Sequence, residues 1–311
     1  MTDDVMVRVE RLGRSFGGLQ AVSDLSFEVR RGELFGLVGP DGAGKTTTLR
    51  MLAGVLRPTE GDAVLDGISV AREPEAVKPH LAYMSQRFGL YADLSVRENL
   101  EFYADLFEVP RAARSARLDR LYAFSNLREF EDRLAGNLSG GMKQKLGLSC
   151  ALIHQPKILL LDEPTFGVDP ISRRDLWVIV HQMVTDGVTV IVSTAYMDEA
   201  ERFDRLVLLH GGRALAIDTP DALQQDIGGE LIALEVDRVR AASRLLSGHP
   251  LVLQAVVFGE RLHVKVRSAD EALPTLRDVL RGAGFDVRVI ERAAPSLEDV
   301  FIDRIARAEA A

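Results

Sequence analysis

The chain has 311 residues, 47% hydrophobic and 27% charged, with a formal net charge of −8. This composition is typical of a globular protein and excludes a disordered or fibrous class, while the negative charge argues against a nucleic-acid partner, which would need a basic surface. No apolar run reaches the ~18–20 residues of a membrane-spanning helix. The first residues lack a basic region followed by an apolar core, and the single cysteine has no partner for an internal disulfide. We therefore expect a soluble protein of the reducing cytoplasm.

The chain begins with two predicted strands, at residues 5–12 and 25–29, where apolar and polar residues alternate. They should form a small antiparallel layer that leads into a buried strand at residues 34–38. Phe16 lies in the connection between them, next to two glycines. An exposed aromatic ring there could stack on a base, and a ring packed on the core is the equal alternative.

The sequence GPDGAGKTT follows the buried strand and precedes helix-forming residues 47–53. Strand, glycine-rich loop and helix are the context of a phosphate-binding loop, and an unliganded turn is the weaker alternative. Glycines let successive N–H groups turn inward around a polyphosphate at the helix N-terminus. Lys45 would reach the outer phosphates, and the Thr46 hydroxyl would ligate Mg²⁺. The residues expected to bind the nucleotide here, called the phosphate loop below, are Gly39, Pro40, Asp41, Gly42, Ala43, Gly44, Lys45, Thr46 and Thr47.

The stretch after Gln86 changes from mixed to helical character. Short strands are predicted at residues 61–67 and 81–85, the second ending at Gln86. Ser95, followed by Glu98, is a capping box that starts one helix, and residues 110–127 carry a second apolar helical stripe. The sequence thus predicts an all-helical insert at about residues 87–150.

A continuous apolar run at residues 158–161 is typical of a parallel strand buried on both faces. It ends at Asp162, whose carboxylate is suited to hold Mg²⁺ opposite Thr46. Glu163 follows and could polarise an attacking water as a general base. A mere acidic strand cap is the alternative, disfavoured by the upstream phosphate loop. A helix at residues 172–186, a strand at 188–193 and a hairpin at 207–217 complete a doubly wound sheet.

Ser139, Gly140 and Gly141 form a second glycine-rich loop, directly before a helix predicted at residues 143–153. The free N–H groups of a helix N-terminus and a serine hydroxyl favour an anion, so the chain carries a second potential phosphate-binding surface. Taken alone, the loop is only a helix cap.

The last part of the chain has the order strand, helix, strand, strand, helix, strand, followed by a helix from Leu297. We therefore expect two domains. An α/β domain at residues 1–228 contains the helical insert, and a smaller α+β domain occupies residues 229–311. The phosphate loop occurs once, so one nucleotide-binding unit is expected.

Together these motifs resemble the nucleotide-binding subunit of ATP-binding cassette (ABC) transporters over about residues 5–220. GPDGAGKTT resembles the Walker A motif, LSGGMKQ the ABC signature, ILLLDEP the Walker B motif and GVDP the D-loop, while Gln86 falls at the Q-loop. The resemblance implies a P-loop ATPase fold with ATP and Mg²⁺ as cofactors. It implies catalytic roles for Glu163 and Gln86, Mg²⁺ ligation by Thr46, Gln86 and Asp162, and adenine stacking by Phe16.

The resemblance also implies partners. In the family, two ATPase subunits, alike or different, form a head-to-tail dimer in which the Ser139 loop of one closes over the γ-phosphate at Lys45 of the other. Integral-membrane permease chains hold such subunits on the cytoplasmic face of the plasma membrane, and the apolar Phe88, Leu90 and Tyr91 after Gln86 are a predicted docking surface. PSLEDVF, residues 295–301, and the domain before it resemble ATPases of type-2 exporters of drugs, polysaccharides or lipids.

Two positions depart from the family pattern. Ala195 stands where a histidine usually follows Ser193 and Thr194, which predicts slow or partner-dependent hydrolysis. Asp41 stands where asparagine or serine is commoner, and we expect its carboxylate to face solvent or the partner subunit. Two alternatives to an exporter remain: an ATP-gated regulatory module with little hydrolysis, and a soluble ABC protein without a permease.

Overall fold

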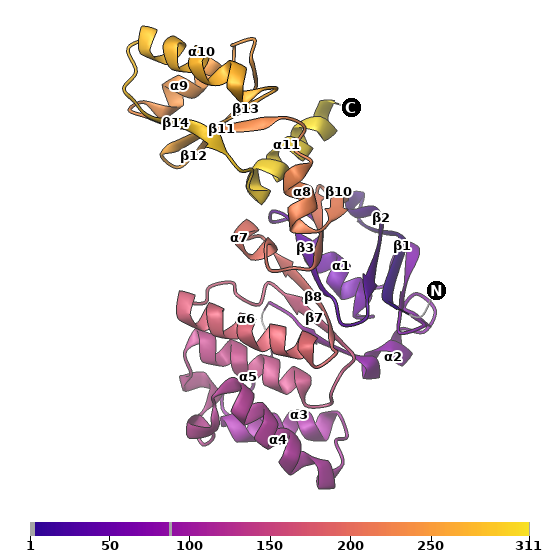
Figure 1. Ribbon diagram of the computed structural model, residues 1–311. Helices are drawn as coiled ribbons and strands as arrows, with labels where there is room; N and C mark the ends of the chain where they lie inside the picture. The colour runs from indigo at the N-terminus through magenta and orange to yellow at the C-terminus, as the bar shows by residue number, and fades with distance from the viewer. Residues whose placement is uncertain (1–3, 87–88, 311) are drawn as a thin grey trace. The chain divides into compact units, whose positions relative to one another are not determined.

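The computed structural model describes residues 4–86 and 89–310, and the chain divides into two compact units between Thr219 and Pro220 (Figure 1). The predicted domain boundary, between residues 228 and 229, falls later in the chain, after helix α8 (Pro220–Gln225). The α8 region associates with the second unit because Arg304 pairs with Asp226 and Arg307 donates to the carbonyl of Ile227 at 2.6 Å.

The first unit contains an antiparallel sheet of order β2-β1-β4-β5. Its first two strands pair as far as Phe16 and Leu19, so the hairpin is longer than the two strands predicted from alternation. Gly17 and Gly18 close it with φ values of +51° and +92°, which glycine adopts readily. The strands are β1 (Val5–Phe16), β2 (Leu19–Arg30), β4 (Glu60–Leu65) and β5 (Ile68–Ser69).

The second sheet of this unit has six strands in the order β10-β9-β3-β8-β7-β6, of which all but β10 run parallel. The strands β3, β7 and β8 are buried along their whole length, as the apolar runs within them predict. Because they are parallel, their carboxyl ends meet at one edge. The strands are β3 (Leu34–Val38), β6 (Leu81–Met84), β7 (Ile158–Asp162), β8 (Thr189–Thr194), β9 (Arg205–His210) and β10 (Arg213–Asp218).

Helix α1 (Lys45–Leu52) lies between the two sheets, where Leu49, Met51 and Leu52 join a core contributed by both. Helices α5 (Gly140–Leu152) and α6 (Pro170–Thr185) cover the other face of the six-stranded sheet, and α3 (Val96–Leu106) and α4 (Arg111–Ser125) pack on α5 as the predicted helical insert (Figure 1). Short helical turns missed by periodicity are α2 (Pro74–Val77), α7 (Met197–Ala200), η1 (Lys78–His80), η2 (Arg128–Phe130) and η3 (Ala135–Asn137).

The second unit follows the predicted βαββαβ order, with an antiparallel sheet ordered β12-β13-β11-β14. Apolar side chains of α9 and α10 cover one face of this sheet. The last helix, α11, is tied to β13 by polar pairs: His263 Nδ1 lies 2.9 Å from Asp299, and Lys265 Nζ lies 2.5 Å from Asp303. The elements are β11 (Glu230–Val236), α9 (Val239–Leu246), β12 (Val252–Phe258), β13 (Arg261–Val266), α10 (Ala269–Gly282), β14 (Val287–Ala293) and α11 (Leu297–Ala310).

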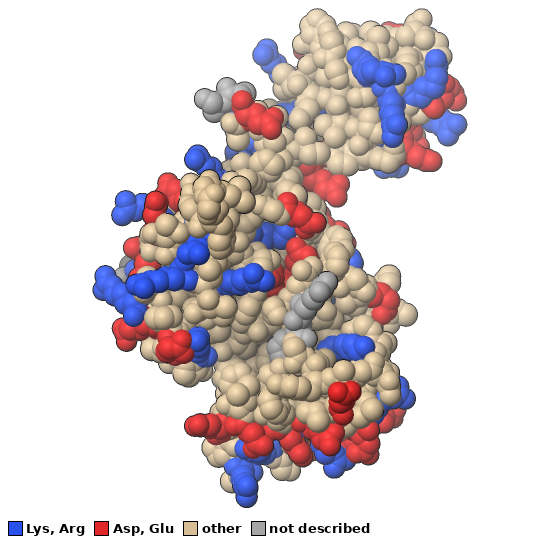
Figure 2. Space-filling view, turned by 180° about the vertical axis from the view of Figure 1, so that it is seen from behind, with Lys and Arg blue, Asp and Glu red and all other residues tan. Residues whose placement is uncertain are grey.

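Within residues 4–86 and 89–310, no helix has the length and apolar character needed to cross a membrane. Charged side chains are spread over the surface, and acidic ones gather along the lower edge of the face seen in Figure 2, which the helical insert forms.

Candidate functional site

The phosphate loop connects β3 to α1 through backbone conformations that favour glycine. Gly42 and Gly44 have φ values of +81° and +100°. A Cβ on Gly44 would also lie 2.7 Å from the carbonyl oxygen of Ala21, so this position has no room for a side chain. The loop therefore brings the start of α1 close to the carboxyl edge of the parallel sheet, where α/β proteins bind their ligands.

The N-terminus of α1 lacks the usual negative partners. No side chain caps it, its first turn holds no acidic residue, and Lys45 occupies its first position. A cation here opposes the helix dipole, and the first N–H groups of a helix have no intrahelical acceptor. The start of α1 is therefore a site that an anion would stabilise.

The Lys45 ammonium is buried, with 4% of the residue exposed, and folds back over the phosphate loop. Its Nζ donates to the carbonyl oxygens of Gly39 at 2.7 Å and Pro40 at 3.0 Å. It also forms an ion pair with Glu163 Oε1 at 3.2 Å. The structure thus brings together the phosphate loop and the carboxylate that follows β7.

Asp162, at the carboxyl end of β7, accepts hydrogen bonds from three hydroxyl groups. Thr46 Oγ1 and Ser193 Oγ donate to its Oδ1 at 2.9 and 2.7 Å, and the Tyr83 hydroxyl donates to Oδ2 at 3.2 Å. Burial and the nearby charge of Asp162 raise the pKa of Tyr83 to about 12, so its hydroxyl remains a donor at neutral pH. The sequence predicts that Thr46 and Asp162 lie together, whereas it contains no local signal for the contacts of Tyr83 and Ser193.

Glu163 adopts a left-handed backbone conformation, with φ +48°. Such a conformation costs a residue other than glycine on the order of 1 kcal/mol, and it persists where the surroundings enforce it. Here the Glu163 N–H is held by the carbonyl oxygen of Ser193 at 3.1 Å and by its Oγ at 3.0 Å. The turn directs the carboxylate toward Lys45 and toward Gln86, whose Nε2 lies 3.2 Å from Glu163 Oε2.

Ala195 directly follows β8 and is half-buried at the same edge. The preceding Thr194 is tied to the phosphate loop, because the Gly39 N–H donates to its carbonyl oxygen at 3.2 Å. Its hydroxyl donates to the buried Glu199 at 2.7 Å and accepts from the Tyr196 N–H at 3.0 Å. The backbone is therefore well anchored here, and the Ala195 methyl group adds no hydrogen-bonding atom.

The second glycine-rich loop lies in a different layer from the phosphate loop, since α5 and α1 are on opposite faces of the six-stranded sheet (Figure 1). Ser139 and Gly140 are exposed, and Ser139 Oγ caps α5 by accepting from the Met142 N–H at 3.3 Å. Gly141 is buried against α6: a Cβ on it would lie 2.1 Å from Ser172 Oγ.

The remaining predicted positions lie at the surface. Phe16 is 44% exposed and its ring lies 4.6 Å from the Arg14 guanidinium, so the alternative of a core-packed ring is wrong. Asp41 is exposed, as expected for a carboxylate that faces away from the loop. Of the predicted docking residues, Tyr91 is exposed, Leu90 is half-buried and Phe88 lies outside the described residues.

The oxygen donors at the carboxyl edge fit Mg²⁺, which prefers one or two carboxylates completed by waters and phosphate oxygens. The Thr46 hydroxyl and the Asp162 carboxylate are within 2.9 Å of each other. Over the part of the chain that the structure describes, no three histidine, cysteine or acidic side chains gather as a metal cluster. The donor set therefore fits a metal bound together with phosphates.

A phosphate loop that joins the buried parallel strand β3 to α1, with carboxylates at the end of β7, the next strand but one in the same sheet, defines a P-loop nucleotide-binding protein of the α/β class. The model of the family "ABC transporter" matches residues 22–166, and that of "ATP-binding protein DrrA1-3-like, C-terminal domain" matches residues 219–305. The chain belongs to the ATP-binding proteins of ABC transporters, which confirms the resemblance and the predicted fold class.

Among curated proteins, the chain is 42% identical over 303 residues to the probable multidrug ABC transporter ATP-binding protein YbhF of Escherichia coli K12, covering 97% of this chain but 52% of that relative. The chain thus spans about half the length of YbhF. It is 35% identical to the daunorubicin resistance ATP-binding protein DrrA2 of Streptomyces coeruleorubidus, covering 96% and 95% of the two chains. It is also 35% identical to the Nod factor export ATP-binding protein I of Ralstonia nicotianae, covering 96% and 92%.

Solved structures agree on the fold. The structure described as an ATP binding subunit of an ABC transporter is 30% identical, with a TM-score of 0.65 over 72% of this chain and 93% of the other. The cbiO1 structure from Clostridium perfringens gives a TM-score of 0.66 at 22% identity, covering 79% and 96%, and supports the fold alone.

Proposed function

We propose that the chain is the ATP-binding and ATP-hydrolysing subunit of an exporter, on the cytoplasmic face of the membrane, and that it drives separate permease chains through closure and opening of an ATPase dimer. The start of α1 carries this proposal: Lys45 at its first position and no acidic residue or cap make it a ready site for a polyphosphate. The drug-resistance and Nod factor export relatives support the exporter role.

In the nucleotide complex, the phosphate loop would surround the β- and γ-phosphates with N–H groups while Lys45 pairs with their charge. Thr46, Asp162 and Gln86 would hold Mg²⁺, which neutralises charge on the phosphates when bound. Phe16, exposed at the end of the β1–β2 hairpin, is available for stacking on adenine. Replacing Thr46 with alanine should weaken ATP binding in Mg²⁺ more than in its absence.

Glu163 would position and polarise the attacking water, an effect worth roughly 10²–10⁴ in rate. Its backbone is fixed by two bonds to Ser193, and Gln86 lies beside its carboxylate. Ala195 supplies no second polar group at this point, so turnover should be slow. Single-turnover hydrolysis of ATP by Glu163→Gln should fall at least about a hundredfold below the wild type, with ATP binding retained. If the wild type hydrolyses ATP measurably and Glu163→Gln does so at the same rate, the role of Glu163 is contradicted.

A regulatory module that binds ATP and scarcely hydrolyses it is the second candidate, favoured by Ala195. Single-turnover hydrolysis by the wild type beside Glu163→Gln separates the two. The variant Ala195→His tests whether Ala195 limits the rate, because a histidine here would lie beside the backbone that holds Gly39. We expect it to hydrolyse ATP faster than the wild type. If wild-type turnover does not exceed that of Glu163→Gln, the regulatory candidate replaces the transport ATPase.

The two glycine-rich loops support a dimer. Ser139 and Gly140 are exposed in the layer of α5, on the opposite sheet face from the α1 layer that begins with Lys45. In a head-to-tail dimer, the Ser139 loop of one subunit would close over the nucleotide held by the other. Glu163→Gln should therefore form an ATP-dependent dimer, measured by light scattering, and the added change Ser139→Arg should abolish it.

A permease segment is proposed to dock on the apolar surface between the helical insert and the sheet. Val55 and Phe107 are exposed and line a cavity of about 230 Å³ together with Tyr83 and Tyr103. The exposed Tyr91 belongs to the same aromatic cluster, because its ring contacts Phe102, which contacts Tyr103. Tyr91→Glu and Phe107→Glu should reduce co-purification with the permease, whereas Leu253→Glu, an exposed apolar position of the second unit, should not.

A further inference from the structure

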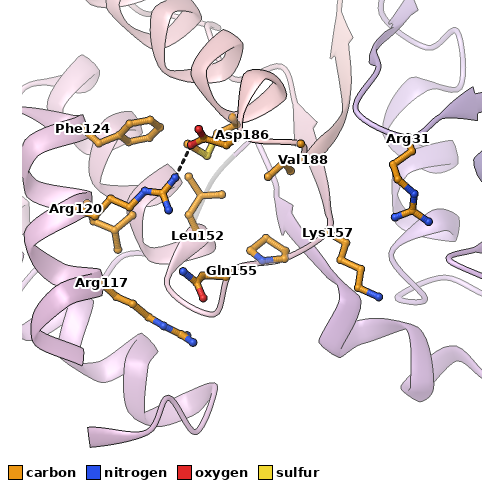
Figure 3. Close-up of a pocket in the computed structure, with 13 residues that line it drawn as sticks. Arg31, Arg117, Arg120, Phe124, Leu152, Gln155, Lys157, Asp186 and Val188 are labelled. Carbon is orange, nitrogen blue, oxygen red and sulfur yellow. Dashed lines mark hydrogen bonds and ion pairs between the residues drawn. The ribbon is translucent and has the colours of Figure 1, made fainter. Parts of the chain in front are cut away.

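We propose that a cavity at the amino ends of the parallel strands binds a small amphiphilic anion, a carboxylate with an apolar body of medium-chain length. The cavity has a volume of about 330 Å³ and is lined by α4, by residues 155–157 before β7 and by residues 186–188 before β8 (Figure 3). It lies at the opposite ends of β7 and β8 from Asp162 and Ser193, so it is separate from the proposed nucleotide site.

The cavity, called the basic cavity below because cations line its rim, has an apolar wall. Its side chains come from α4, α5 and α6 and from the residue before β8; three of them are buried and two are half-buried. They are Leu121, Phe124, Leu152, Met183 and Val188. Such a surface favours the burial of a hydrocarbon body, at about 25 cal/mol for each Å² removed from water.

The rim of the cavity carries excess positive charge. Arg31, Arg117, Arg120 and Lys157 line it, with Asp186 as its acidic lining residue. Arg120 pairs with Asp186 at 2.5 Å, while Lys157 and Arg31 share Asp66, a carboxylate outside the lining, at 2.5 and 3.5 Å.

Arg117 is the rim cation that is available to form an ion pair with an incoming anion. Its Nη1 donates to the carbonyl oxygen of Ile153 at 3.0 Å. No carboxylate among the described residues forms an ion pair with it, and its side chain extends along the cavity in Figure 3. A guanidinium has several donors in one plane and binds a carboxylate through two of them, so one bond to Ile153 leaves donors available.

The size and charge of the basic cavity define the class of ligand. A volume of about 330 Å³ is at the small end of the range for small-molecule sites and holds no peptide helix. The positive rim stands out in a chain with a net charge of −8, so it attracts an anion locally. A bound molecule would contact α4 together with the segments that enter β7 and β8, and would join the helical insert to the parallel sheet.

The test uses the full chain and decanoate, a ten-carbon carboxylate. Methyl-labelled methionine gives one reporter in the cavity, Met183, whose signal is assigned from Met183→Leu; Met51 and Met84, in the core elsewhere, are internal controls. We expect decanoate to shift the Met183 signal saturably and to leave those of Met51 and Met84 in place. Calorimetry with the same ligand should give the same dissociation constant.

Three arginine variants distinguish a specific site from general adsorption. Arg117→Gln should weaken decanoate binding by about tenfold or more, because it removes a charge-assisted contact. Arg117→Lys keeps the charge and should retain most of the affinity. Arg111→Gln removes the same charge from an exposed position of the same helix that does not line the cavity, and should bind like the wild type.

Several results would overturn the proposal: no binding of decanoate to the wild type at millimolar concentration, equal affinity of Arg117→Gln and wild type, an unmoved Met183 signal, or equal binding of decanol, which has the same chain without the charge. ATP binding by Arg117→Gln serves as the folding control, since this residue lies outside the proposed nucleotide site.

Discussion

Replacing Ser193 with alanine should destabilise the first unit by about 1.5–3 kcal/mol, the usual value of a hydrogen bond to a charged group. Ser193 is fully buried, and its hydroxyl donates to Asp162 at 2.7 Å while accepting from the Glu163 N–H at 3.0 Å. In the variant, the Glu163 N–H still donates to the Ser193 carbonyl oxygen at 3.1 Å, so the hydrogen bond that is lost without replacement is the one to the Asp162 carboxylate.

Urea unfolding followed by tryptophan fluorescence measures this loss, because the chain has one tryptophan, Trp177, buried in α6 of the first unit. Ser149→Ala is the matched control: it removes an equally buried hydroxyl that donates to a neutral carbonyl, at 2.8 Å, and should cost about 0.5–1.5 kcal/mol. A loss in Ser193→Ala no larger than that in Ser149→Ala would refute the reasoning.

Three further predictions concern packing and pH. Gly141→Ala should destabilise the first unit by about 1–3 kcal/mol in the same urea assay, because its Cβ would lie 2.1 Å from Ser172 Oγ, whereas Gly140→Ala, which meets nothing within 4 Å, should be neutral or stabilising. Burial raises the pKa values of Tyr83, Tyr103 and Tyr122 to about 12. At about pH 11, phenolate absorbance should therefore show at least these three tyrosines protonated in the native chain and ionised in urea. The stability that these tyrosines contribute is present below the usual pKa near 10 and is lost as the pH rises toward 12. Burial alone would raise the pKa of Asp299, but hydrogen bonds from His263 and Ser296 outweigh it and lower the pKa from its usual 3.8. The Asp299 carboxylate therefore stabilises the fold above pH 3.8, and this stabilisation is lost as the pH falls through the lowered pKa. Hydrogen exchange in α11 should accelerate over that pH range in the wild type and should depend less on pH in Asp299→Asn.

The sequence predicts those parts of the candidate site whose residues directly follow an apolar strand. The phosphate loop, Asp162 and Glu163 each follow an apolar run that is buried whichever strands lie beside it, so pattern alone located them. Tyr83 and Ser193 lie on the neighbouring strands β6 and β8, and their contact with Asp162 depends on strand order and register, which a single sequence does not encode locally.

The less predictable parts of the fold depend on tertiary contacts. The β1–β2 hairpin continues to Phe16 because its two strands pair with each other beyond their alternating segments. Helix α8 has six residues, too few for a periodic pattern, and its place in the second unit follows from the Arg304 and Arg307 contacts near its end. Such short elements acquire their position from distant residues.

Because Glu163 forms an ion pair with Lys45, it is an internal competitor of any phosphate that would bind this lysine. The Glu163 carboxylate lies 3.2 Å from the ammonium that a phosphate would use, so the two anions compete for one cation. If a nucleotide binds as proposed, its affinity would depend on the difference between two ion pairs, and a change that weakens the internal pair would increase the apparent affinity without touching the nucleotide. Under the proposed function, arrival of a polyphosphate would also free the Glu163 carboxylate, so that occupancy of the phosphate loop and release of the proposed base would occur in a single exchange of partners.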